Sequence, residues 1–262
     1  MFMKNEIPLS PDERLDEVNE NLWLIQKKNG LTFGTDAYLL AAFARPAPSS
    51  FAVELGGGTG IVSFLLARKE KVRSVAAVEI QKSFAELIER NAALNDLSAR
   101  VYPLCKDIRK IGKRDFELQP VLVVANPPYL AKNSGKTNLS PEKEIARHEC
   151  FGDIFDFCAC AGRILGSGGR FVTVWRAERL SDLYAALREN RMEPKRTIFI
   201  HADQDAPPCG VLTEAVKDAS VGLRVLPPLF LYEREIEKDG SRKLTPEAER
   251  IYETCAFPDC GA

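Results

Sequence analysis

Residues 51–70 read FAVELGGGTGIVSFLLARKE, and this stretch decides the fold of the 262-residue chain. Residues 51–55 have the length and apolar character of a buried strand, whereas residues 61–70 have the apolar spacing of a helix. The glycines between them let the backbone turn sharply and approach a ligand closely. The stretch therefore predicts a strand, a tight turn and a helix, the repeating unit of a sheet with parallel strands.

The same alternation continues along the chain. Apolar runs typical of buried strands stand at residues 74–80, 100–105, 121–126, 169–176 and 196–202. Helical patterns occupy residues 82–96, 153–165 and 178–190. Residues 210–218 and 223–233 then follow without an intervening helix, which predicts an antiparallel strand pair at the end of the sheet. We therefore predict an α/β fold, a doubly wound and mostly parallel twisted sheet with helices on both faces.

A small hairpin and a helix precede the sheet. The segments LWLIQ at 22–26 and LTF at 31–33 flank Asn29-Gly30, a pair that strongly favours a hairpin turn because both residues tolerate positive φ. The following segment TDAYLLAAFA has helical apolar spacing, with Thr35 or Asp36 able to cap its first turn.

These patterns divide the chain into three parts. We expect the hairpin and helix within residues 1–50, the main domain at 51–233 and a charged tail at 234–262. The tail contains TPEAERIYE, which has room for one short helix.

Composition limits the classes of protein. The chain is 45% hydrophobic and 28% charged, as in soluble globular proteins, and its net charge of -1 gives no overall basic field for nucleic acid. The N-terminus lacks the apolar core of a signal peptide, and no apolar run reaches bilayer length. The seven cysteines show no zinc-ligand spacing. We therefore expect a cytoplasmic protein with no metal and no membrane partner; its oligomeric state is open.

The glycine turn indicates which ligand the sheet binds. A dinucleotide site has the pattern G-x-G-x-x-G, but its third glycine, counted from Gly56, falls on Ile61. The sequence instead reads E-x-G-x-G-x-G, with the acidic residue and glycines at Glu54, Gly56, Gly58 and Gly60. A carboxylate before the turn suits a cationic ligand better than a pyrophosphate. S-adenosylmethionine, a sulfonium with an amino acid end, meets these demands.

Two later strands carry acidic residues at their ends. Glu79 ends the second strand, where a carboxylate can accept hydrogen bonds from both ribose hydroxyls. Asp107 follows the third strand and is placed to accept from an adenine amino group, with Ile80 and Ile108 as apolar walls. Each acid alone could be a helix cap, but ligands of open α/β sheets bind beyond the carboxyl ends of strands, which favours a nucleoside site.

The fourth strand ends in Asn126, Pro127, Pro128 and Tyr129. The exocyclic amine of adenine is a poor nucleophile because its lone pair is delocalised into the ring. Two acceptors, the Asn126 side-chain oxygen and the Pro127 carbonyl, would take both N–H hydrogens and aim the lone pair at a methyl group. Prolines hold the acceptors rigidly, and Tyr129 can stack on the base. The alternative is a proline turn with a surface tyrosine.

These motifs resemble those of the class I S-adenosylmethionine-dependent amino-methyltransferases, which act on adenine N6 or, in one branch, on a protein glutamine amide. LIQKKNGLTFGTDAYLLAAF, IARHE, EPKR and PPLFLY further resemble the bacterial tRNA N6-adenine methyltransferases that modify the adenosine 3' of the anticodon in a valine tRNA. The resemblance runs from about residue 14 to about residue 252. It implies a Rossmann-like class I methyltransferase fold, and it implies that Phe33, Gly34, Thr35 and Asp36 close over the methionine end of the cofactor.

The sequence departs from the family pattern at one position, and the roles of several other residues remain open. Gly57 stands where Ala, Ser or Thr is commoner, a change that only removes a side chain. His148 has a structural role as its simplest interpretation, and Arg147 is a candidate phosphate contact. Further candidates for RNA contact are Lys27, Lys28 and the basic segments 106–114 and 131–143.

Other functions remain open on the sequence alone. A protein glutamine N5-methyltransferase would use the same pocket, but that family usually has an N-terminal helical domain for which we find no room before residue 51. A DNA adenine methyltransferase would carry a target-recognition domain. A NAD-dependent oxidoreductase is disfavoured by the missing glycine, and a non-catalytic RNA-binding module has no use for an aligned amine.

Overall fold

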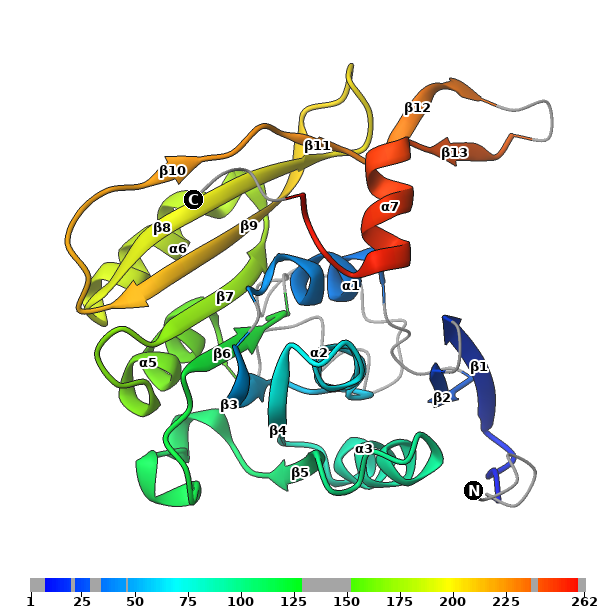
Figure 1. Cartoon of the computed structure of the whole chain (residues 1–262), viewed down its shortest axis with the longest axis vertical. Coiled ribbons are helices and arrows are strands. Elements are labelled where there is room, and N and C mark those ends of the chain that lie inside the picture. Colours follow the sequence, from blue (N-terminus) through cyan, green and yellow to red (C-terminus); the bar gives the residue numbers. More distant parts are fainter. Residues whose placement is uncertain are drawn as a thin grey trace, which may run out of the picture.

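A computed structural model of the chain describes residues 8–19, 22–28, 34–45, 47–128, 152–236 and 240–258. Its centre is a nine-stranded sheet (Figure 1) in the order β10-β8-β9-β7-β6-β3-β4-β5, with β11 also paired to β8. The strands are β3 (Ala47–Leu55), β4 (Val72–Glu79), β5 (Val101–Cys105), β6 (Leu122–Ala125), β7 (Arg170–Trp175), β8 (Met192–His201), β9 (Pro208–Lys217), β10 (Arg224–Val225) and β11 (Leu229–Phe230).

The half of the sheet from β5 to β7 is parallel, as the sequence predicted. Helices α2 (Ile61–Arg68) and α3 (Lys82–Leu94) follow β3 and β4, and they pack against one face together with α1 (Thr35–Phe43). Helices α5 (Ile154–Ile164) and α6 (Leu180–Glu189) cover the opposite face. Both faces of the parallel strands are thus buried, which explains why these strands read as continuous apolar runs.

The other half of the sheet is antiparallel. Strand β9 lies between β7 and β8 and runs antiparallel to both, so the predicted antiparallel pair is β8 with β9. Residues 223–233 contribute less regular structure than the sequence suggested. Within the main sheet they form only β10 and β11, which pair with β8 in parallel and are separated by Pro227 and Pro228, while residues 232 and 233 begin the separate strand β12 (Tyr232–Ile236). Prolines cannot donate to a ladder of hydrogen bonds, so a single long strand is excluded there.

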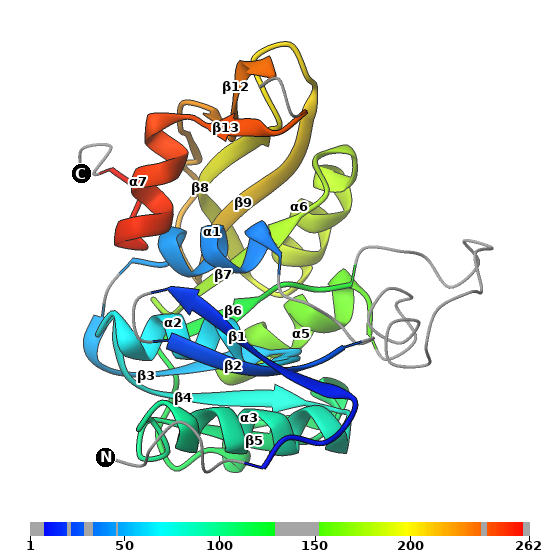
Figure 2. The same ribbon diagram turned by 90° about the vertical axis from the view of Figure 1, so that its right-hand side faces the viewer.

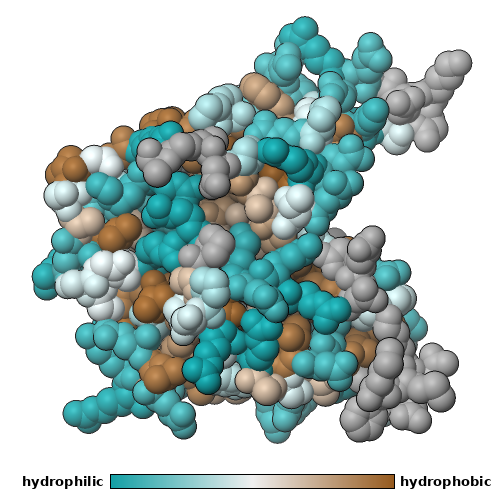
Figure 3. Space-filling view, viewed as in Figure 1, coloured by the Kyte–Doolittle hydropathy of each residue, from teal (hydrophilic) through white to brown (hydrophobic). Residues whose placement is uncertain are grey.

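The surface of this edge is partly apolar. Figure 3 shows brown side chains at the end of the molecule where β10 lies. The exposed apolar residues of this segment are Val221, Leu223 and Val225. At the other end of the sheet, β5 contains Pro103 in the middle of the strand.

The N-terminal hairpin exists, but its strands are not those that we predicted. Strand β1 (Glu13–Asn19) pairs antiparallel with β2 (Leu22–Lys27). The predicted turn at Asn29-Gly30 and residues 31–33 lie outside the described residues. The sequence of β1, ERLDEVN, is too charged to be recognised as a strand, and it is held by contacts with a distant helix.

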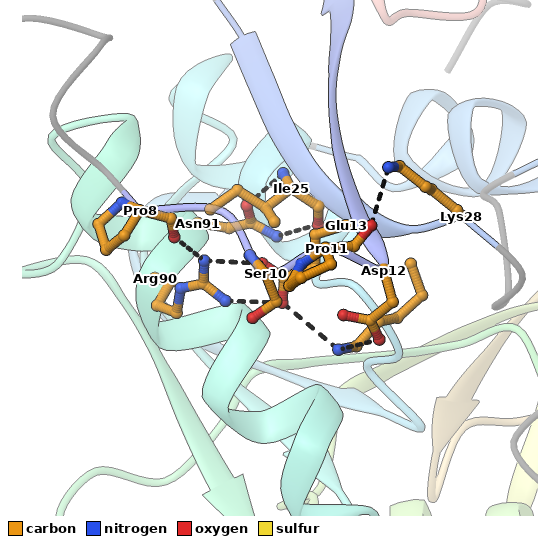
Figure 4. Close-up of polar contacts among 10 residues, drawn as sticks. Pro8, Ser10, Pro11, Asp12, Glu13, Ile25, Lys28, Arg90 and Asn91 are labelled. Carbon is orange, nitrogen blue, oxygen red and sulfur yellow. Dashed lines mark hydrogen bonds and ion pairs between the residues drawn. The ribbon is translucent and has the colours of Figure 1, made fainter.

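Helix α3 and its C-cap residue Asn95 anchor this hairpin, and Figure 4 shows the contacts of Arg90 and Asn91. The Arg90 guanidinium donates to both carboxylate oxygens of Glu13 at 2.8 and 2.9 Å, and this contact lowers the pKa of Glu13 to about 2. The Asn91 side chain accepts from the Ile25 backbone N–H at 2.7 Å and donates to the Ile25 carbonyl. Asn95 bonds to Trp23 in the same way. The amides thus extend the edge of β2 as a strand would.

The N-cap of α1 lies earlier in the chain than the predicted cap, Thr35 or Asp36. Its N-cap is Gly34, and no side chain caps it. Thr35 and Asp36 are the first two residues of the helix, so neither occupies the cap position. All helical residues from 37 to 43 are buried. The described helices include none that is long and apolar enough to cross a membrane.

The C-terminal segment forms a second hairpin and a helix. Strands β12 (Tyr232–Ile236) and β13 (Arg242–Leu244) pair antiparallel, and α7 (Pro246–Thr254) follows as the predicted short helix. Thr245 caps α7 by accepting from the Ala248 N–H at 3.2 Å. Figures 1 and 2 both show α7 beside α1.

Candidate active site

The carboxyl ends of β3, β4, β5 and β6 lie at one edge of the sheet, because these neighbouring strands run parallel. Leu55 at the end of β3 is level with Val78 of β4 and with Ala125 of β6. The glycine turn, Glu79, Asp107 and Asn126 therefore meet at this edge, in the order that the sequence predicted. Ligands of open α/β sheets bind in this position.

The glycine turn between β3 and α2 has a conformation that few other residues adopt. Gly56, Gly58 and Gly60 have φ values of +72°, +54° and +85°. A Cβ atom added at Gly58 would meet no atom within 4 Å, whereas one at Gly60 would lie 2.7 Å from Phe64 Cε2. Gly58 thus faces open space, and Gly60 faces the core.

Gly57 is also closely packed. An added Cβ would lie 3.1 Å from Ile88 Cδ1 and 3.2 Å from Ala77 Cβ. The sequence suggested that Gly57 only removes a side chain. In the structure Ile88 and Ala77 occupy the space that a larger residue at this position would need.

Glu54 lies beneath the turn and is only 3% exposed. Its Oε2 accepts from the Ser63 N–H at 2.9 Å and from the Ser63 hydroxyl. Burial raises the pKa of Glu54 to about 8, even though the bonds from Ser63 act in the opposite direction. The carboxylate thus holds the first turn of α2, a role that the sequence analysis did not foresee for it.

Glu79 is the acidic residue most tightly bound to the turn itself. Its Oε2 accepts from the Gly58 N–H at 2.9 Å, and its Oε1 accepts from the Gln81 N–H at 2.8 Å. Burial raises its pKa, and the backbone donors Gln81, Gly58 and Ile80 counteract that effect. The carboxylate therefore has a fixed orientation, and Ile80, which follows it, is half-buried.

Asp107 and Ile108 form the next part of the edge. The Asp107 carboxylate accepts from the Arg109 N–H at 2.9 Å and forms an ion pair with Arg109 Nη2 at 2.7 Å. The Arg109 side chain lowers the pKa of Asp107. Ile108 is buried, and Arg163 of α5 donates at 2.9 Å to the carbonyls of both Ile108 and Ile111. Arg163 of α5 therefore holds the backbone of this short segment in place.

Asn126 and Pro128 are half-buried and Pro127 is buried, directly after β6. Tyr129 and Phe33 lie outside the described residues, as do Arg147, His148 and the basic segment 131–143. Gly34 is exposed, while Thr35 and Asp36 are half-buried at the start of α1. The charge of Asp36 acts on Cys209 at the start of β9 and on Tyr252 of α7, so the start of α1 lies near both elements.

The sequence analysis did not identify several residues that support this edge. Ser63, Gln81, Arg109 and Arg163 each hold a residue that the sequence did point to. Ser63 and Gln81 lie close to the motifs, so strand and helix boundaries would have indicated them. Arg163 is distant in sequence from the backbone that it clamps, and only the tertiary structure reveals it.

The basic residues proposed for RNA contact fall into two groups. Lys27, Lys28 and Lys106 bond within the protein, to Asp12, to the Pro11 carbonyl and to Asp115, respectively. Lys110, Lys113 and Arg114 are exposed. The described residues contain no group of three or more side chains that could hold a metal ion.

Comparison with known proteins adds to this geometry. The chain matches the family Methyltransferase small domain over residues 28–189. The tRNA1(Val) (adenine(37)-N6)-methyltransferase of Porphyromonas gingivalis ATCC 33277 is 31% identical over 183 residues, which cover 63% of this chain and 68% of the relative. The protein of the same name from Cronobacter sakazakii is 28% identical over 168 residues, which cover 64% of this chain and 67% of the relative.

Solved structures show the same fold. A predicted O-methyltransferase from Agrobacterium tumefaciens has a TM-score of 0.66 at 24% identity and covers 85% of this chain and 98% of its own. The tRNA m1G37 methyltransferase of M. jannaschii has a TM-score of 0.55 at 15% identity and covers 80% of this chain and 58% of its own. The family match spans more than half of the sequence and the Porphyromonas relative is covered over two thirds of its length, so the chain belongs to the methyltransferase small domain family and, within it, to the family of the tRNA1(Val) (adenine(37)-N6)-methyltransferases.

Proposed function

We propose that the chain transfers a methyl group from S-adenosylmethionine to the exocyclic N6 of an adenosine in tRNA, at position 37 of a valine tRNA as the names of its relatives state. The observation that carries this proposal is the position of Asn126-Pro127-Pro128. These residues follow β6, whose last residue Ala125 is level with Leu55, the residue before the glycine turn. A tRNA substrate implies a cytoplasmic reaction.

The edge of the sheet fits the proposed cofactor. Gly58 faces open space, so a ligand can approach the backbone of the turn closely. Glu79 would hold the ribose hydroxyls, and Asp107 the adenine amino group between Ile80 and Ile108. Gly34, Thr35 and Asp36 would close over the methionine end. When bound, S-adenosylmethionine supplies an electrophilic methyl group.

Asn126 and Pro127 would then act by alignment. Their oxygens accept the two N–H hydrogens of the target amine, which favours a pyramidal nitrogen with its lone pair directed at the methyl group. Alignment of this kind lowers a barrier by up to about 7–11 kcal/mol in favourable cases. The new carbon–nitrogen bond would form as the methyl carbon–sulfur bond breaks, and the sulfur would leave as the neutral thioether of S-adenosylhomocysteine. The methylated nitrogen would then carry a positive charge, be strongly acidic and lose a proton to water. No residue with a pKa near neutral is required for this step.

The target adenosine must leave the stack of bases to reach this pocket. The exposed basic residues of segment 106–114 are Arg109, Lys110, Lys113 and Arg114; Arg109 is paired with Asp107, and Lys106 in the same segment is paired with Asp115. Phosphate contacts from such residues orient an RNA but do not read its sequence. The pocket therefore selects an amine on a planar base, and the choice of tRNA rests on other contacts.

The proposal is tested by methyl transfer from labelled S-adenosylmethionine to total unmodified tRNA, followed by nucleoside analysis. We expect N6-methyladenosine with the wild type and a loss of about 100-fold or more in kcat with Asn126→Ala, because alignment is removed. Cofactor binding, measured by calorimetry, should persist in the variant. Asn190→Ala serves as the control, since among the described residues its side-chain amide bonds to the Ala186 carbonyl of α6, away from the carboxyl edge of the parallel strands.

Two outcomes would contradict the proposal. Labelled protein glutamine with unlabelled RNA would keep the amine pocket but replace the substrate. A wild-type protein that does not bind S-adenosylmethionine would exclude the methyl donor as well.

A further inference from the structure

The C-terminal helix α7 is part of the core. Ala248, Ile251 and Cys255 are each 0% exposed and belong to the same apolar cluster as the residues of α1. Thr245 also ties the start of α7 to the sheet, because its hydroxyl donates to the Phe230 carbonyl at 2.7 Å. Figure 1 and Figure 2 show α7 packed across α1.

Two aromatic contacts join α7 and the residues after it to the two ends of α1. The rings of Tyr38 and Tyr252 meet edge to face with centroids 5.4 Å apart, and those of Phe43 and Phe257 do so at 5.5 Å. Tyr38 is near the start of α1 and Phe43 is its last residue. Contacts at both ends of a short helix fix its rotation as well as its position.

The end of α1 is also bound by a buried lysine. Lys71 is 5% exposed, and its ammonium donates at 2.8–2.9 Å to the carbonyls of Ala41, Ala42 and Ala44. These are groups that a helix leaves without partners at its C-terminus. The C-terminal end of α1 is thus anchored independently of α7.

The start of α1 is held in a different way. No side chain caps it, although Tyr38 donates from its hydroxyl to the Val18 carbonyl of β1 at 2.8 Å. Tyr252 lies close to this end, because the negative charge of Asp36 adds to the effect of burial in raising the pKa of Tyr252. The ring of Tyr252 therefore supports the turn of α1 that contains Asp36 and Tyr38.

We propose that Tyr252 is a positioning residue for the cofactor: packed on Tyr38, it holds Gly34, Thr35 and Asp36 in the orientation that closes over the methionine end. This inference rests on the proposed function, which assigns that closing role to residues 34–36. A helix start that is free to move would spend only part of its time in the binding orientation. The apparent affinity for the cofactor is then the intrinsic affinity multiplied by the fraction of time that the helix start spends in the binding orientation.

The test compares full-length variants by three measurements: Kd for S-adenosylmethionine, kcat for methyl transfer at saturating cofactor, and the melting temperature. We expect Tyr252→Ala to raise Kd about fivefold while kcat stays within about twofold of the wild type. Tyr252→Phe should bind as the wild type does, because the ring makes the contact. Tyr252→Leu, which retains apolar volume, should raise Kd about twofold and replaces the alanine variant if that protein does not fold.

A matched control separates positioning from loss of stability. Leu187 is 0% exposed on α6, which packs on the opposite face of the sheet. Leu187→Ala should lower the melting temperature at least as much as Tyr252→Ala and leave Kd unchanged. An unchanged Kd in both Tyr252→Ala and Tyr252→Leu would overturn the inference, while a wild type that binds no cofactor would instead overturn the proposed function.

Discussion

The two halves of the sheet each bury a glutamate, and they treat its carboxylate differently. In the parallel half, Glu54 of β3 is bound by the neutral N–H and hydroxyl groups of Ser63. In the antiparallel half, Glu214 of β9 is 0% exposed and contacts three guanidiniums. Arg45 donates from Nε at 3.2 Å, Arg196 from Nη1 at 3.4 Å, and Arg170 Nη1 lies 3.9 Å away.

The difference shows two ways in which one sheet accommodates a buried acidic side chain. Arginines around Glu214 join β7, β8, β9 and the segment after α1, so this carboxylate links elements that are distant in sequence. Neutral donors around Glu54 supply no counter-ion, and burial raises its pKa to about 8, so its carboxyl group is mostly protonated at neutral pH. A proton neutralises the buried carboxyl group of Glu54, whereas cationic side chains neutralise that of Glu214.

The largest effect is expected when the arginine cluster loses its carboxylate. Glu214→Gln should lower the free energy of unfolding by about 3–5 kcal/mol, because three guanidiniums lose their common partner in a buried position. Urea unfolding measures this change, and Kd for the cofactor should not change. Glu193→Gln is the control: it pairs with the exposed Arg188 and should cost less than about 1 kcal/mol. Equal losses of unfolding free energy in Glu214→Gln and Glu193→Gln would show that the buried arginine cluster is no more stabilising than an exposed ion pair.

Stability should also depend on pH through Glu54. Its pKa is about 8 in the folded protein and 4.5 as an ordinary glutamate, so the unfolded chain releases this proton first as pH rises. The stabilising effect of the bound proton is complete below pH 4.5 and is lost as pH rises to about 8. We expect the free energy of unfolding to fall by about 3–4 kcal/mol between pH 5 and 8 through this group.

Glu54→Gln provides the comparison for that experiment. Glutamine keeps an acceptor for Ser63 but does not titrate, so its unfolding free energy should vary less with pH over the same interval. A variant with the same pH dependence as the wild type would show that another group is responsible.

The smallest effect concerns the exposed ion pair at the cofactor edge. Arg109 is 44% exposed, and its pairing with Asp107 should contribute less than about 0.5 kcal/mol to stability. Arg109→Ala should nevertheless raise Kd for S-adenosylmethionine about threefold, because Asp107 loses the side chain that orients it. Calorimetry measures this change, with Arg114→Ala as the exposed control. A weaker affinity in both variants would indicate a general charge effect.

Local patterns were sufficient to predict most of the parallel half. Each strand and helix there has its own apolar signature, and parallel strands necessarily end at the same edge. The sequence therefore predicts that Glu79, Asp107 and Asn126 lie at one edge of the sheet, and the structure has them there. Their roles toward cofactor and substrate remain predictions, because no ligand contact tests them.

The features that sequence analysis missed depend on contacts between distant segments. Strand β1 is charged and relies on Arg90 and on β2, which Asn91 and Asn95 of the same helix hold. The cap of α1 was wrong by one residue, since helix boundaries depend on surrounding packing more than on local propensity. In β8, one extra residue between Pro194 and Arg196 shifts the register and sets Arg196 opposite Glu214. Such a bulge leaves no mark in the apolar pattern.

Prolines at both edges of the sheet affect the tendency of the protein to aggregate. An open sheet edge invites pairing with strands of other molecules, and exposed valines strengthen that attraction. Pro103 interrupts the donors of β5 at one end, and Pro227 and Pro228 divide the other end into two strands of two residues each. Neither edge therefore has a continuous row of N–H groups. The prolines of the two edges thus disfavour pairing with strands of other molecules and hence aggregation.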